Sequence, residues 1–150
     1  MLHPYNYIRE DDLRYTFVTD RGVSYVVYFI DCSNLFENIG SLYSFSIERE
    51  TNCNPQPIDY RIAHTVVSIL KSFFENDMNS MIMTCDSYDN KEHKRSLLFE
   101  RWYKTYNDNT VLKYDYTIEI EGVIQYTSIF INRLNPLRNI ILESFTNFLS

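Results

Sequence analysis

Hydrophobic and polar residues alternate along three segments in the first third of the chain. They run over residues 14–19, 23–31 and 42–48, and a turn containing Gly22 separates the first two. Period-two alternation rich in β-branched and aromatic residues is typical of strands that bury one face. The three segments therefore predict an antiparallel meander. Residues 1–13 before it are polar, and we expect them to be irregular and loosely packed.

Apolar residues then recur at intervals of three and four, which is the period of an amphipathic helix. This pattern covers residues 60–76, and Asp59 is placed to cap the first turn. Residues 80–85 form a short apolar run that suits a central strand, because such a strand is buried on both faces. The helical period returns over residues 91–106.

The remaining sequence predicts a hairpin and a final helix. Alternating segments at residues 111–119 and 123–132 flank a turn at residues 121–122, and Asn135 followed by proline is a typical helix start. The resulting order is β-β-β-α-β-α-β-β-α. It predicts an α+β fold with a mixed, mainly antiparallel sheet of about six strands, in a single domain over residues 1–150.

Composition narrows the classes of function. The chain has 20 acidic and 14 basic residues and a net charge of −6, which disfavours a general nucleic-acid binder. Its cysteines, Cys32, Cys53 and Cys85, are odd in number and lack metal-ligand spacing, so we expect neither a disulfide framework nor a metal site. The N-terminal residues do not have the pattern of a signal peptide, and no apolar run is long enough to span a membrane. These features predict a cytoplasmic protein without membrane association.

A strand at residues 81–85, a polar loop containing Asn90 and the run Leu-Phe-Glu-Arg-Trp-Tyr at residues 98–103 follow one another. Together with the order of elements over residues 14–132, they resemble the core of the GNAT superfamily of acyl-CoA-dependent acyltransferases. The run Cys-Asp-Ser at residues 85–87, followed by Arg95, Leu98-Phe99 and the run Arg-Trp-Tyr at residues 101–103, also resembles a set of small, uncharacterised bacterial proteins. The resemblance implies a GNAT-like scaffold.

Two departures from the GNAT pattern affect the chemistry that the resemblance implies. Members of that superfamily hold the pyrophosphate of the cofactor on a glycine-rich turn that opens the first core helix. The corresponding residues 52–64 contain no glycine and include two prolines, each of which lacks a backbone donor. The family's catalytic tyrosine would fall on Phe99, which has no proton to donate. We therefore expect a scaffold that lacks the cofactor motif.

The first functional hypothesis is a non-catalytic regulatory module, without cofactor, that binds another protein or a second copy of itself. The long final hairpin is a candidate for pairing across a dimer axis. The alternative is an N-acyltransferase with a degenerate pyrophosphate loop. It would bind acetyl-CoA through Arg61, Ile62, Thr65 and Asn90, with Tyr103 or Tyr88 as the acid. The sequence leaves open whether the chain is an enzyme, and the missing motif weighs against it.

A third hypothesis is a nucleic-acid accessory protein, although the net negative charge disfavours it. The helix predicted at residues 91–106 is basic and carries interleaved aromatic residues, which suits phosphate contact and base stacking. Its candidates for interaction with any partner are Lys94, Arg95, Arg101, Trp102 and Tyr103. Cys85, at the end of the predicted central strand, is a candidate nucleophile, but a buried structural thiol explains it as well.

Overall fold

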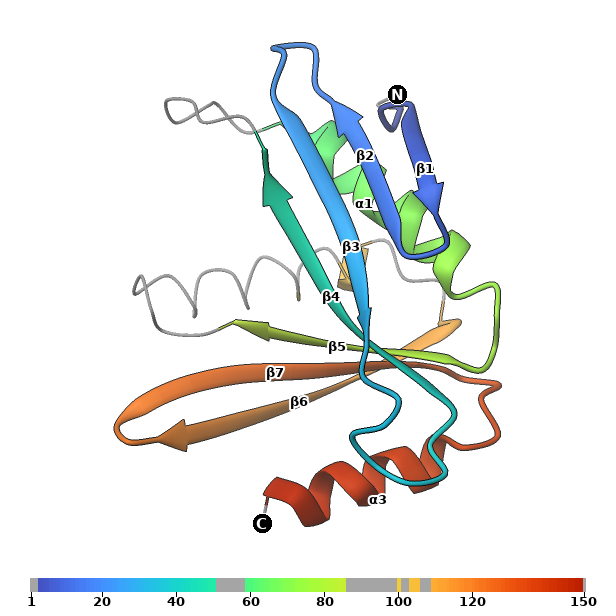
Figure 1. Ribbon diagram of the computed structural model, residues 1–150, viewed down its shortest axis with the longest axis vertical. Helices are drawn as coiled ribbons and strands as arrows, with labels where there is room; N and C mark the ends of the chain where they lie inside the picture. The colour runs from blue at the N-terminus through green and yellow to red at the C-terminus, as the bar shows by residue number, and fades with distance from the viewer. Residues whose placement is uncertain (1–2, 51–58, 86–99, 101–102, 106–108, 150) are drawn as a thin grey trace. The chain divides into compact units, whose positions relative to one another are not determined.

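The computed structural model describes residues 3–50, 59–85, 100, 103–105 and 109–149. The described strands form a seven-stranded sheet in the order β1-β2-β3-β4-β5-β7-β6 (Figure 1). The pairing of β4 with β5 is parallel, and the pairings of β1 with β2, β2 with β3, β5 with β7 and β6 with β7 are antiparallel. The α+β class and the mixed, mainly antiparallel sheet are therefore as predicted. The elements are β1 (Tyr7–Asp11), β2 (Arg14–Val18), β3 (Ser24–Asp31), β4 (Ser41–Arg49), α1 (Tyr60–Phe73), β5 (Asn79–Cys85), β6 (Val111–Ile120), β7 (Val123–Asn132) and α3 (Arg138–Leu149).

The prediction of about six strands was wrong, because β1 adds a seventh. This strand pairs with β2, with Ile8 opposite Thr16, in the segment for which the sequence predicts irregular structure. Every residue of β1 after Tyr7 is exposed. An edge strand of this kind has no hydrophobic face, so the pattern that reveals the other strands is missing from it.

The chain comprises two compact units. The first consists of Met1–Ile30 and Phe45–Glu75, and the second of Asp31–Ser44 and Asn76–Ser150. The single domain expected from the sequence stays a prediction.

The core of the first unit is a cluster of aromatic rings. The helix α1 lies behind β2 and β3 in the view of Figure 1. Phe73 of α1 stacks on Phe29 of β3, with ring centroids 4.3 Å apart and planes 5° from parallel. Tyr15 of β2 meets the Phe29 ring edge-on, and Phe45 of β4 packs against it at a tilt. All four rings are buried, so aromatic packing holds α1 against the strands of this unit.

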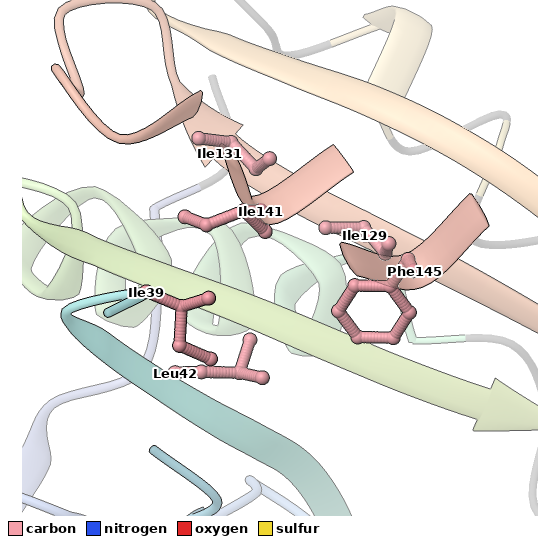
Figure 2. Close-up of a cluster of buried hydrophobic side chains, with 6 residues drawn as sticks. All are labelled: Ile39, Leu42, Ile129, Ile131, Ile141 and Phe145. Atoms are coloured by element: carbon pink, nitrogen blue, oxygen red, sulfur yellow. The ribbon is translucent and has the colours of Figure 1, made fainter. Parts of the chain in front are cut away.

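The core of the second unit consists of five aliphatic side chains and one phenylalanine, and it lies between the sheet and α3. The strand β7 lies between β5 and β6 in the sheet, and its last six residues are buried. Gly40 lies next to this core with a φ of +73°, and a Cβ there would approach the Leu137 Cδ1 to 3.0 Å. Figure 2 shows the buried cluster, which comprises Ile39, Leu42, Ile129, Ile131, Ile141 and Phe145.

The local signals in the sequence agree with the helix starts. Asp59 caps α1 by accepting a hydrogen bond from the Arg61 N–H through its side chain. The side chain of Asn135 accepts from the Leu137 N–H just before α3 begins. Within the described residues, no helix combines the length and the apolar character that crossing a membrane requires.

Candidate functional site

The N-terminus of α1 is the position at which the GNAT resemblance predicts an anion site. The two carboxylate oxygens of Asp59 are both engaged there. Oδ1 accepts from the Arg61 N–H at 2.9 Å, and Oδ2 accepts from the hydroxyl of Tyr5. The backbone carbonyl of Asp59 also accepts from the Ile62 N–H at 3.1 Å. Donors at the start of the helix are thus bonded to a residue of the same chain that carries a negative charge.

The charge of Arg61 is used within the first unit. Its Nη1 donates to the Asp20 carboxylate at 2.8 Å, and its Nε donates to the His3 carbonyl at 2.9 Å. The guanidinium lies over the Tyr5 ring, 3.9 Å from the centroid, which is cation–π geometry. Three separate contacts therefore hold this cation, two of them with the N-terminal segment and one with the turn between β2 and β3.

Thr65 completes the attachment of the N-terminal segment. Thr65 lies one helical turn after Arg61, and its side chain is fully buried. The hydroxyl accepts from the Tyr5 N–H at 2.8 Å and donates to the Arg61 carbonyl at 2.6 Å. The Tyr5 ring itself is buried and stacked on Phe17. We call the set of His3, Tyr5, Asp20, Asp59, Arg61 and Thr65 the N-terminal clasp.

The electrostatics of the clasp favour a neutral tyrosine. Burial first, and then the hydrogen bond to Asp59, raise the pKa of the Tyr5 hydroxyl above 10.0. The phenol therefore stays a donor at neutral pH. A carboxylate at the helix N-terminus, with Arg61 already paired to Asp20, opposes the binding of a second anion at this place.

Arg61, Ile62 and Thr65 lie on the first turns of α1, where they are bonded to the chain's own residues, and their role in binding a cofactor stays a prediction. Sequence reasoning missed Tyr5 and Asp20, the partners of Asp59 and Arg61. No local signal could have found them, because each lies about forty residues or more from its partner along the chain. Asn90, Tyr88, Lys94, Arg95, Arg101 and Trp102 lie outside the described residues.

We expect Thr65→Val to lower the free energy of unfolding by about 1–3 kcal/mol, because the isosteric valine leaves the buried Tyr5 N–H without its acceptor. Guanidinium unfolding measures the change. The matched control is Thr146→Val, since the Thr146 hydroxyl bonds the carbonyl four residues earlier at an exposed position of α3. It should cost less than about 0.5 kcal/mol. Equal losses in the two variants would show that the Tyr5 contact carries no weight.

Tyr103 belongs to the second unit and lies beside β6, the last strand of the sheet. Its ring meets Phe130 of β7 edge-on at 5.9 Å, and its hydroxyl donates to the Val111 carbonyl. Burial raises the pKa of this hydroxyl, and a backbone hydrogen bond from Lys113 opposes that rise in part. The candidate acid is therefore a neutral phenol bonded to the backbone of β6.

A polar group that sequence reasoning missed lies on β6 and β7. The Asp115 carboxylate accepts from the Ser128 hydroxyl at 2.6 Å and from the ammonium of Lys113, whose side chain is only 6% exposed. Burial alone would raise the pKa of Asp115, but the hydrogen bonds from Lys113 and Ser128 bring it below its ordinary value. The sequence does contain a signal for the pairing of Asp115 with Ser128, because a turn at residues 121–122 places these two residues opposite each other in the hairpin.

The candidate nucleophile Cys85 ends β5, opposite Tyr126 of β7. Across the ranges that the structure describes, histidine, cysteine, aspartate and glutamate side chains do not gather in groups of three or more that could hold a metal ion.

The fold defines this chain as an α+β protein with a mixed sheet and an N-terminal segment tied to its first helix. Residues 58–147 match a family of unknown function, DUF6169, and the chain belongs to this family. No curated protein and no solved structure matches the chain. The family match covers α1, β5, the final hairpin and nearly all of α3, and it leaves β1 to β4 outside.

Proposed function

We propose that this protein is a non-catalytic module on a GNAT-like scaffold that binds another protein or a second copy of itself. The N-terminus of α1 carries the argument. An acyl-CoA pyrophosphate needs free helix donors and an unpaired cation. At α1, Asp59 occupies those donors and Asp20 pairs with Arg61. The proposal includes no cofactor and a cytoplasmic location.

Surface apolar groups support a role in binding. Leu134 before α3 and Phe148 near its end are 69% and 64% exposed, and Ile140 between them is exposed as well. Ile140 and Phe148 are eight residues apart, which places both on one side of the helix. Exposed apolar side chains grouped on one element are a feature of protein-binding surfaces. The first test nevertheless concerns the cofactor, because it separates this proposal from the alternative most directly.

Calorimetric titration of the folded full-length chain with acetyl-CoA and with free CoA should give no saturable heat. A stoichiometric signal at up to millimolar ligand would instead favour the N-acyltransferase with a degenerate pyrophosphate loop. In that case Arg61→Gln should abolish binding, and Arg138→Gln, which removes a cation from the second unit, should not. Circular dichroism on each protein confirms that it is folded.

The binding role itself is tested by crosslinking and affinity capture. We expect either a defined partner protein or self-association of the purified chain. A strict monomer that captures no partner would contradict the proposal. Titration with short single-stranded nucleic acids tests the accessory-protein hypothesis, and we expect no salt-sensitive binding, since the chain carries a net charge of −6.

A further inference from the structure

The strand β6 lies at one end of the sheet, so within the described part of the chain one of its edges has no neighbouring strand. The Arg133 N–H donates to the Thr110 carbonyl at 2.8 Å, so the backbone carbonyl of Thr110 points toward the strand that β6 pairs with. Backbone groups alternate in direction along a strand. The even-numbered residues of β6 therefore direct their backbone N–H and C=O groups toward β7. The odd-numbered residues, beginning with Val111 and Lys113, direct theirs outward.

The turn between β6 and β7 independently gives the same assignment of inward and outward residues. Ile120 pairs with Val123, and the two residues between them, Glu121 and Gly122, have φ values of 52° and 81°. Two positive φ values are the signature of a two-residue type I′ hairpin, in which the pair next to the turn is hydrogen-bonded. The backbone groups of Ile120 must then point toward β7, in agreement with the direction of the hydrogen bond at Thr110.

Tyr103 occupies only the beginning of the outward edge. Its hydroxyl donates to the Val111 carbonyl and accepts from the Lys113 backbone. Farther along, Asp115, Thr117 and Glu119 are exposed, and no residue in the described part of the chain bonds their outward backbone groups. A strand edge with unpaired donors and acceptors is a template for pairing with another strand.

Tyr103 occupies the edge at Val111 and Lys113, so an axis of pairing must lie at residues 115–118, and there the charges select a register for pairing with an identical strand. Two antiparallel copies related by a two-fold axis must place outward residues opposite outward residues. An axis at Asp115 would oppose two aspartates, and an axis at Thr117 would oppose Asp115 to Glu119 of the second copy. An axis at Tyr116 places Asp115 opposite Thr117 of the second copy and brings no like charges together.

We propose that β6 pairs antiparallel with β6 of a second copy, about a two-fold axis at Tyr116, in a symmetric homodimer. Asp115 and Thr117 exchange backbone hydrogen bonds with Thr117 and Asp115 of the second copy. The ring of Tyr116 packs against the core of its own unit, so the axis does not require it to move. This inference rests on the proposed function and names its partner as the chain itself.

Sedimentation equilibrium of the full chain over a range of concentrations tests the proposal. The wild-type chain should dimerise, and Thr117→Pro should be monomeric, because proline removes an outward donor that the β6–β7 ladder does not use. Thr117→Val keeps that donor and should still dimerise. A wild-type chain that stays monomeric at millimolar concentration, or a Thr117→Pro variant that still dimerises, would overturn the proposal.

A charge pair at the same position tests the register, and it remains informative if the proline variant fails to fold. Thr117→Lys would face Asp115 of the second copy and should tighten the dimer roughly 2- to 30-fold, since the contact occurs twice. Thr117→Asp should weaken it by a similar factor. Weakening by both substitutions would refute the axis at Tyr116. A monomer that captures a different protein would end this inference and leave the proposed function standing.

Discussion

An Ile129→Ala variant should lose about 2–5 kcal/mol of unfolding free energy. Ile129 lies within β7, is fully buried, and belongs to the cluster that Ile141 and Phe145 of α3 complete (Figure 2). The truncation leaves a cavity that the surroundings cannot close, because β5 and β6 hold β7 on both sides. Guanidinium unfolding followed by circular dichroism measures the loss.

The matched control is Ile124→Ala on the same strand. Ile124 is 38% exposed and lies near the hairpin turn, so its truncation should cost well under 1 kcal/mol. If the two variants lost the same amount, the aliphatic cluster would not be the core of the second unit.

Phe73→Ala should destabilise the first unit by about 3–5 kcal/mol. The ring of Phe73 is buried, is stacked on Phe29 and also meets Phe74 edge-on. The variant therefore loses buried area and the geometry-dependent aromatic contact, which is worth about 0.5–1.5 kcal/mol beyond area. Near-ultraviolet circular dichroism reports the loss of aromatic packing, and denaturant unfolding reports its free energy.

Phe148→Ala removes the same side chain from a surface position. Phe148 is 64% exposed, and its ring meets the Phe36 ring in an edge-to-face arrangement. We expect a cost of at most about 1 kcal/mol. A loss for Phe148→Ala that equals the loss for Phe73→Ala would mean that α1 is not held by the aromatic stack.

The candidate site shows where sequence reasoning succeeds and where it stops. The cap at Asp59 was predictable, because the acceptor and the Arg61 N–H are two residues apart. The pairing of Arg61 with Asp20 was not, since 41 residues separate them and no periodicity links them. Arg61 alone suggests a phosphate contact. Its partner in the structure, Asp20, lies in the turn between β2 and β3, so the pair instead supports a structural role for Arg61 within the first unit.

Tyr103 illustrates the same limit in the second unit. From the sequence, its phenol hydroxyl makes it a candidate acid, and its aromatic ring makes it a candidate for partner binding. The contact with the Val111 carbonyl depends on the approach of residues 103–105 to the edge of β6, which no pattern in the sequence encodes. The alignment of Asp115 with Ser128, by contrast, follows from the turn alone, because a two-residue loop sets the register of a whole hairpin.

By itself, the sequence determined the type and the approximate limits of β2 to β7, α1 and α3, because burial of one face imposes a period of two or 3.6 residues. It also determined the helix caps and the final hairpin, which depend on neighbours in the chain. The tertiary structure alone decided the presence of β1, the insertion of β5 between β4 and β7, and the partners of Tyr5, Arg61 and Tyr103. These features arise from contacts between distant segments, where a side chain's role depends on what it meets.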